Sequence, residues 1–146
     1  MDNIKINNHY LISFFICLIS FNAYTSSDRS LSSEGAELYF IQPKEGQILE
    51  SPIRVKFGLR GMGVAPAGVD ISGTGHHHLL VDVEELPPLD EPIISDSNHI
   101  HFGGGQTEVL LELSPGNHKL QLLLGDKYHI PHLPPIISKE ISIIIK

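Results

Sequence analysis

The stretch Gly73-Thr74-Gly75-His76-His77-His78-Leu79-Leu80-Val81-Asp82 decides how the fold is predicted, because three consecutive imidazoles run directly into an alternating apolar segment. Successive side chains of a β-strand point to opposite faces of its sheet. As a strand, this stretch places His76 and His78 on one face and His77 on the other. The apolar Leu79 shares the face of His77, which is therefore expected to be partly buried.

The same two-residue alternation recurs on both sides of this stretch, in segments separated by turn residues. The predicted strands cover residues 37–41, 53–60, 76–83, 107–113, 118–124 and 136–146, with a further alternation at 99–102. No segment shows a convincing apolar period of 3.6 residues, which an amphipathic helix would need. The pattern predicts an all-β fold, an immunoglobulin-like antiparallel β-sandwich of about seven strands. A small barrel is the alternative.

Three connecting segments carry their own predictions. The turn Ser114-Pro115-Gly116-Asn117 is expected to join its two flanking strands as a hairpin. The closely spaced prolines of residues 84–92 exclude a helix and favour an extended surface excursion. The glycine triplet at residues 103–105 indicates a place where the backbone has positive φ or approaches another group closely.

The composition limits the partners of the protein. The chain of 146 residues has a formal net charge of −7 and no run of lysine or arginine. Nucleic acids and anionic membranes both require a basic surface, so neither is an expected partner. Histidine is unusually frequent, with 9 residues against 10 lysines and arginines together. A metal ion or another envelope protein is the expected partner, and the oligomeric state is left open.

The N-terminal segment is typical of a signal peptide. Lys5 precedes an apolar run from Leu11 to Phe21, and about 11 residues are too few to span a bilayer. We expect a signal peptide at residues 1–26, a flexible lead-in at 27–36 and a single β-sandwich domain at 37–146. The mature chain is then periplasmic or secreted, without a membrane span; an uncleaved anchor is the alternative.

Three motifs resemble one uncharacterised bacterial envelope family, the domain of unknown function numbered 4399. They are Gly73–Leu80, Asn98–Glu108 and Pro115–Asp126, and the resemblance extends from about Glu37 to the C-terminus. It implies a secreted bacterial domain. Because the family has no established activity, the resemblance assigns no catalytic residue.

Histidines two positions apart on a strand lie on one face about 6 to 7 Å apart, a spacing at which both can bind one metal ion. His76 with His78 and His99 with His101 have this spacing. The candidate metal ligands are His76, His78, His99, His101, His129 and His132, with Asp82 or Glu108 available to complete a site. The single cysteine, Cys17, lies in the expected signal peptide, so nitrogen and oxygen ligands favour copper(II) or zinc over copper(I).

Three functions from different classes follow. The favoured one is a non-enzymatic, secreted or periplasmic β-sandwich that binds copper(II) or zinc. The second is an envelope interaction or structural module in which the histidines only order loops, as is expected of His77 and His118. The third and least favoured is a metal-dependent enzyme with Glu108 or Asp126 as general base. Convergence of the candidate imidazoles would favour a metal site, and exposed imidazoles with pKa values of about 6.5 would release the metal in mild acid.

Overall fold

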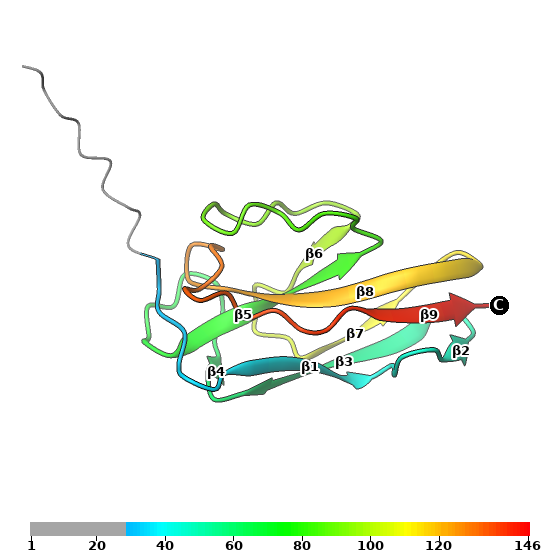
Figure 1. Ribbon diagram of the computed structural model, residues 1–146, viewed down its shortest axis with the longest axis horizontal. Helices are drawn as coiled ribbons and strands as arrows, with labels where there is room; N and C mark the ends of the chain where they lie inside the picture. Colours follow the sequence, from blue (N-terminus) through cyan, green and yellow to red (C-terminus); the bar gives the residue numbers. More distant parts are fainter. Residues whose placement is uncertain (1–28) are drawn as a thin grey trace, which may run out of the picture.

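The computed structural model describes residues 29–146, which form two β-sheets packed face to face (Figure 1). The expected signal peptide lies outside the described residues. The three-stranded sheet has the order β1 (Glu37–Gln42), β3 (Ile53–Arg60), β7 (Glu108–Leu111). The larger sheet has the order β2 (Ile48–Leu49), β9 (Ile141–Ile145), β8 (Gly116–Gly125), β5 (Thr74–Val81), β4 (Gly63–Val64), and β6 (His99–His101) also pairs with β5. The prediction of an all-β sandwich is confirmed.

The main core lies between the two sheets and follows the alternation of the strands. Val55 and Phe57 of β3 face Leu79 of β5 and Leu122 of β8, and all four side chains are buried. Each fully buried aliphatic or aromatic side chain contributes about 1.5–3 kcal/mol to folding. His77 lies on this inner face of β5, with its ring centroid 5.1 Å from that of Phe57. The inner face of β5 therefore belongs to the core, which leaves its other face for His76 and His78.

The prediction of a hairpin at residues 114–117 is wrong. The strand before this turn, β7, pairs with β3 in the smaller sheet, while β8 pairs with β5 and β9 in the larger one. The turn therefore carries the chain from one sheet to the other. Turn residues predict where a chain reverses its direction, but they do not predict whether the two flanking strands pair in one sheet. The strands can instead belong to two sheets whose apolar faces pack against each other. The β2–β9 and β4–β5 pairings are parallel, whereas the sequence predicts only antiparallel pairs.

A second, smaller apolar cluster covers part of the outer face of the larger sheet. Leu80 of β5 and Leu123 of β8 are buried there beneath Ile93. Ile93 belongs to the segment between β5 and β6, which forms no helix and folds back over the sheet (Figure 1). Its backbone N–H donates to the carbonyl of His129 at 2.9 Å. The proline-rich excursion and the loop after β8 thus meet above the sheet and shelter the histidine face of β5.

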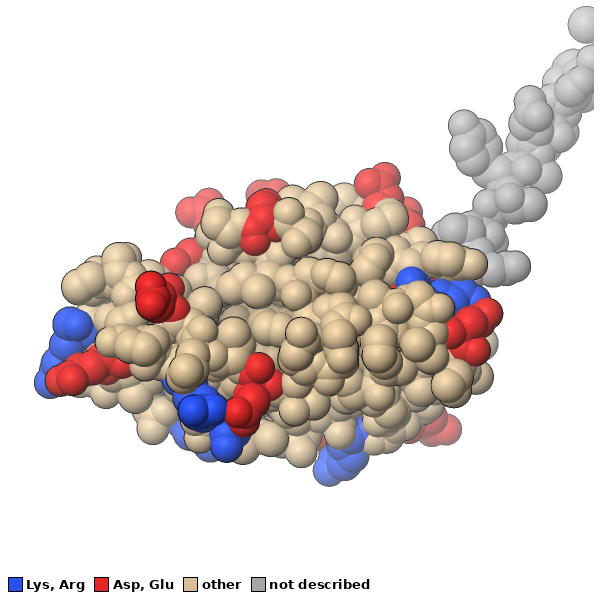
Figure 2. Space-filling model, turned by 180° about the vertical axis from the view of Figure 1, so that it is seen from behind, with Lys and Arg blue, Asp and Glu red and all other residues tan. Residues whose placement is uncertain are grey.

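The charged side chains of the surface form local groups. Figure 2 shows one face of the molecule, on which lysine and arginine side chains lie in separate small groups with uncharged surface between them. Arg54 and Glu108 form one ion pair at 2.6 Å. Glu108 is therefore engaged on the smaller sheet. Among residues 29–146, no helix is long and apolar enough to cross a membrane.

Candidate metal centre

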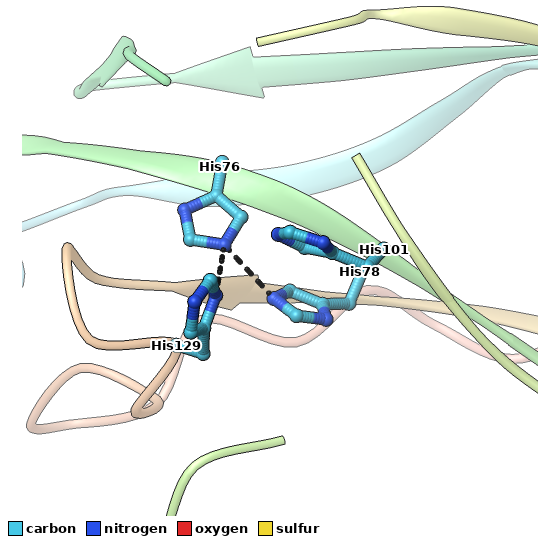
Figure 3. Close-up of side chains that lie close together, drawn as sticks. All are labelled: His76, His78, His101 and His129. Atoms are coloured by element: carbon cyan, nitrogen blue, oxygen red, sulfur yellow. Dashed lines mark hydrogen bonds between the residues drawn. The ribbon is translucent and has the colours of Figure 1, made fainter. Parts of the chain in front are cut away.

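Four of the six candidate histidines converge on the outer face of the larger sheet (Figure 3). β5 supplies His76 and His78, β6 supplies His101, and the loop after β8 supplies His129. Each ring offers one nitrogen, and these four nitrogens lie within 4.8 Å of one another. The register explains two of the positions, because His78 pairs directly with His101 and their side chains share one face.

The shortest distances between ring nitrogens fit a shared ion. His76 Nε2 lies 3.0 Å from His129 Nδ1 and 3.1 Å from His78 Nε2. Two nitrogens bound tetrahedrally to one zinc ion at about 2.0–2.1 Å are separated by about 3.4 Å. These two distances need only small outward movements of the rings to reach that value, whereas the widest separation in the cluster, up to 4.8 Å, needs an inward movement.

Hydrogen bonds between the rings cannot satisfy both short contacts of His76 Nε2. An imidazole nitrogen carries either one proton or one lone pair in the ring plane, so it makes one strong hydrogen bond. His76 Nε2 has two nitrogen neighbours, in His78 and His129. Only one of these contacts can therefore be a well-aligned hydrogen bond, and the other is a close approach without one. A cation among the nitrogens would accept all of the lone pairs and remove this conflict.

Glycines leave the space that two of the rings occupy. A Cβ atom on Gly125 would lie 2.9 Å from His78 Nε2, and one on Gly103 would lie 2.3 Å from His101 Cε1. Nδ1 of His76 and Nδ1 of His78 are buried without a hydrogen-bond partner among the described residues. Packing, and not the hydrogen bond that metal-bound histidines usually make through their other nitrogen, therefore orients these rings. The expected close approach at the glycine triplet is confirmed.

The fourth histidine is held by a tight loop. His129 has a φ of 67°, a left-handed conformation that non-glycine residues rarely adopt. The Asp126 carboxylate accepts hydrogen bonds from the N–H groups of Tyr128 at 2.8 Å and Ile130 at 3.0 Å, on either side of His129. Asp126 thus organises the loop. From the sequence, Asp126 was expected only as a general base, although an aspartate that accepts hydrogen bonds from backbone N–H groups a few residues later is a recognised turn signal.

The buried rings are neutral at physiological pH. Burial, assisted by the neighbouring His129 and His101, lowers the pKa of His76 to about 4. Burial and the surrounding histidines lower the pKa of His78 to about 3, and burial also lowers the pKa of His101. These rings therefore present lone pairs without first losing a proton. Protons therefore compete with a metal ion for His76 and His78 only at a pH below the mildly acidic range that was expected for exposed imidazoles.

The structure places the other two candidate ligands outside this cluster. His99 lies opposite Leu80, further along the β5–β6 pair, and its Nδ1 contacts Asp96 Oδ1 at 2.9 Å. His132 is buried, with Nε2 3.1 Å from the carbonyl oxygen of Thr74. Each of these two rings is therefore directed to a hydrogen-bond partner outside the cluster of four histidines.

The two histidines expected to be structural differ from each other. His118 Nδ1 lies 2.7 Å from the Asp82 carboxylate and Nε2 lies 2.8 Å from the Ser114 carbonyl, so the ring must be protonated to donate to both. Burial lowers the pKa of His118, but Ser114 and Asp82 together outweigh burial and raise it. His77 is fully buried, and neither ring nitrogen has a hydrogen-bond partner among the described residues. Burial lowers the pKa of His77 to about 4, and the nearby backbone of Gln106 opposes this shift. The Gln106 backbone does not form a hydrogen bond with either ring nitrogen.

Comparison with known proteins yields one relationship. No curated protein and no solved structure matches the chain. A family model described as "Domain of unknown function (DUF4399)" matches residues 55–146, whereas the sequence motifs suggested a resemblance from about Glu37. The match includes β5, β6 and β8 and all four converging histidines. Because it covers more than half of the 146 residues, the chain belongs to the DUF4399 family.

Proposed function

We propose that this protein binds one divalent transition-metal ion, copper(II) or zinc, through His76, His78, His101 and His129. The observation that carries the proposal is the convergence of four ring nitrogens from three separate segments. Imidazole is a favourable ligand for both ions. Residues 29–146 contain no cysteine, which leaves nitrogen and oxygen ligands.

We place this activity in the bacterial envelope and regard it as non-enzymatic. The location rests on the expected signal peptide. A binding role without catalysis is supported by the surroundings of Asp126 and Glu108, the two carboxylates considered as general bases. Asp126 accepts three hydrogen bonds, from Ser30, Tyr128 and Ile130, and is therefore committed to holding the loop. Glu108 is paired with Arg54, so neither proposed general base is free at the centre.

The experiment is a metal titration of protein produced from the 146-residue sequence, with the N-terminus of the purified product determined by mass spectrometry. Copper(II) and zinc are each titrated against a chromophoric chelator, after elemental analysis of the purified protein. We expect a Kd tighter than about 10 µM for at least one ion, which is a free energy of about 7 kcal/mol. Binding of neither ion at this level would reject the metal site and favour the envelope interaction module.

Matched variants assign the ligands. The double variant His76→Ala with His78→Ala removes two of the four rings and is expected to weaken binding more than 100-fold. The control is His99→Ala, which removes a histidine from the same strand pair but outside the cluster. It is expected to bind as the unmodified protein does. Equal losses in the double variant and the control would show that binding is not located at the cluster.

A further inference from the structure

We infer that residues 29–33 form a clamp that positions the metal ligand His129, with Ser30 as the positioning residue. The inference rests on the proposed metal site and adds the elements that hold its fourth ligand. The clamp is distant in sequence from the loop it contacts, because Ser30 and Asp126 are 96 positions apart.

The clamp lies along the segment that follows His129. The Arg29 guanidinium donates to the carbonyl oxygen of Pro131 at 3.0 and 2.9 Å and to that of His132 at 2.7 Å. Ser32 N–H donates to the Leu133 carbonyl at 3.1 Å, and Leu133 N–H donates to the Ser30 carbonyl at 2.9 Å. A flexible lead-in was expected here. Residues 29–32 instead form backbone and side-chain hydrogen bonds with residues 131–133, which follow the ligand His129.

Ser30 connects the clamp to the ligand. Its hydroxyl donates to Asp126 Oδ2 at 2.8 Å, and the other carboxylate oxygen of Asp126 accepts the N–H groups on either side of His129. Asp126 is 2% exposed, so a lost hydrogen bond is not readily replaced by water. The left-handed conformation of His129 persists only while its surroundings hold it. Removing the Ser30 hydroxyl therefore loosens the loop at the position of a ligand.

The coupling must act in both directions. If an ordered clamp increases the affinity of His129 for the ion, a bound ion increases the stability of the clamp by the same factor. A chain trimmed beyond Ser30 keeps all four histidines but loses this contact. Removal of the N-terminal segment through Ser30 would thus lower the metal affinity without altering any ligand.

The test measures zinc and copper(II) affinity, with the ion alone as the probe, in single and double variants of the full chain. Ser30→Ala is expected to weaken binding about 10-fold, the lower end of the range for residues that orient metal ligands. Ser30→Thr retains a hydroxyl and should restore affinity. The control is Ser142→Ala, at an exposed serine of β9 outside the clamp, which should bind the ions as the unmodified protein does. Arg29→Gln, expected to weaken binding in the same direction, replaces Ser30→Ala if the latter does not fold.

A double-mutant cycle with His129→Ala identifies the route of the effect. If Ser30 acts through His129, adding Ser30→Ala to His129→Ala causes no further loss of affinity. An equal loss in both backgrounds would overturn the inference, as would unchanged affinity in folded Ser30→Ala. Hydrogen exchange supplies a second readout: the ion should slow exchange at Ser32 and Leu133 in the unmodified protein but not in His129→Ala.

Failure of the proposed function gives a different result. If the unmodified protein binds neither ion, the metal site itself is rejected. The contact on which the clamp depends is still tested in metal-free protein, where Ser30→Ala should accelerate exchange of the Tyr128 and Ile130 amides. Unchanged exchange at those two amides would overturn the clamp independently of any metal.

Discussion

Replacement of Gly125 by alanine perturbs the candidate centre without changing a ligand. Gly125 lies in β8 directly opposite His76, and its φ is outside the left-handed region, so its backbone accepts alanine. The new Cβ atom would lie 2.9 Å from His78 Nε2, whereas carbon and nitrogen atoms in contact are normally about 3.5 Å apart. The ring must therefore move by about 0.6 Å, which exceeds the tolerance of about 0.2 Å for a metal–ligand distance.

We expect Gly125→Ala to weaken metal binding by about 10- to 100-fold, or about 1.4–2.7 kcal/mol. The domain should remain folded, because the crowding cost of about 1–3 kcal/mol is partly offset by the lower chain entropy of alanine. Competition with a chromophoric chelator measures the affinity, and urea unfolding of metal-free protein measures the stability. Gly63→Ala is the control, since its Cβ would meet only Thr74 Cγ2 at 3.4 Å and the Gly73 carbonyl at 3.9 Å.

The new Cβ atom would also lie 3.3 Å from His129 Cα, a less severe contact than the one with His78 Nε2. In a His78→Ala background the contact with the ring nitrogen is absent, so the further loss of affinity should be much smaller than the loss in the unmodified protein. A folded Gly125→Ala protein with the affinity of the unmodified chain would refute the assignment of His78 Nε2 as a ligand atom.

Three further predictions concern the histidines individually. Because the pKa of His76 is about 4 in the folded chain against 6.5 for an ordinary histidine, the unfolded chain binds more protons between these values. The metal-free protein should therefore lose about 3 kcal/mol of stability from this group as the pH falls from about 6.5 to about 4, measured by urea unfolding. The raised pKa of His118 has the opposite sign: its contribution is complete below pH 6.5 and is lost as the pH rises through the raised pKa. The stability difference between the unmodified protein and His118→Gln should accordingly shrink at alkaline pH, and a constant difference would contradict the ionic contact with Asp82. His77→Leu should raise the unfolding free energy by about 1 kcal/mol with unchanged metal affinity, because it removes two buried nitrogens without partners. A lower unfolding free energy would contradict this expectation.

Local alternation predicted most of the fold and half of the candidate centre. The faces of Ile53–Arg60 and of the three consecutive histidines follow from the period of a strand, and the structure has them as expected. The antiparallel register that places His78 beside His101 depends on which strands become neighbours. Strand pairing is a long-range property that the alternation of a single segment does not contain.

The loop ligand was harder to predict, for a physical reason. His129 and His132 lie three positions apart in one irregular segment, and nothing in their spacing distinguishes them. The hydrogen bonds of Asp126 turn His129 towards β5, whereas the ring of His132 is directed to the Thr74 carbonyl. Those bonds in turn depend on Ser30, which was assigned to a flexible lead-in. Side-chain direction in a loop is set by such distant partners, so composition identified the candidates but not the members of the cluster.

The spread of the four histidines along the chain, from position 76 to position 129, has a consequence for folding. An ion held by all of them would be a reversible cross-link that joins two strands and a loop, in a domain whose described residues contain no cysteine for a disulfide. Such a cross-link stabilises only the folded chain, by about 2.7 kcal/mol when the free ion is at 100 times its Kd. The lifetime of the folded domain would then follow the concentration of free metal around it.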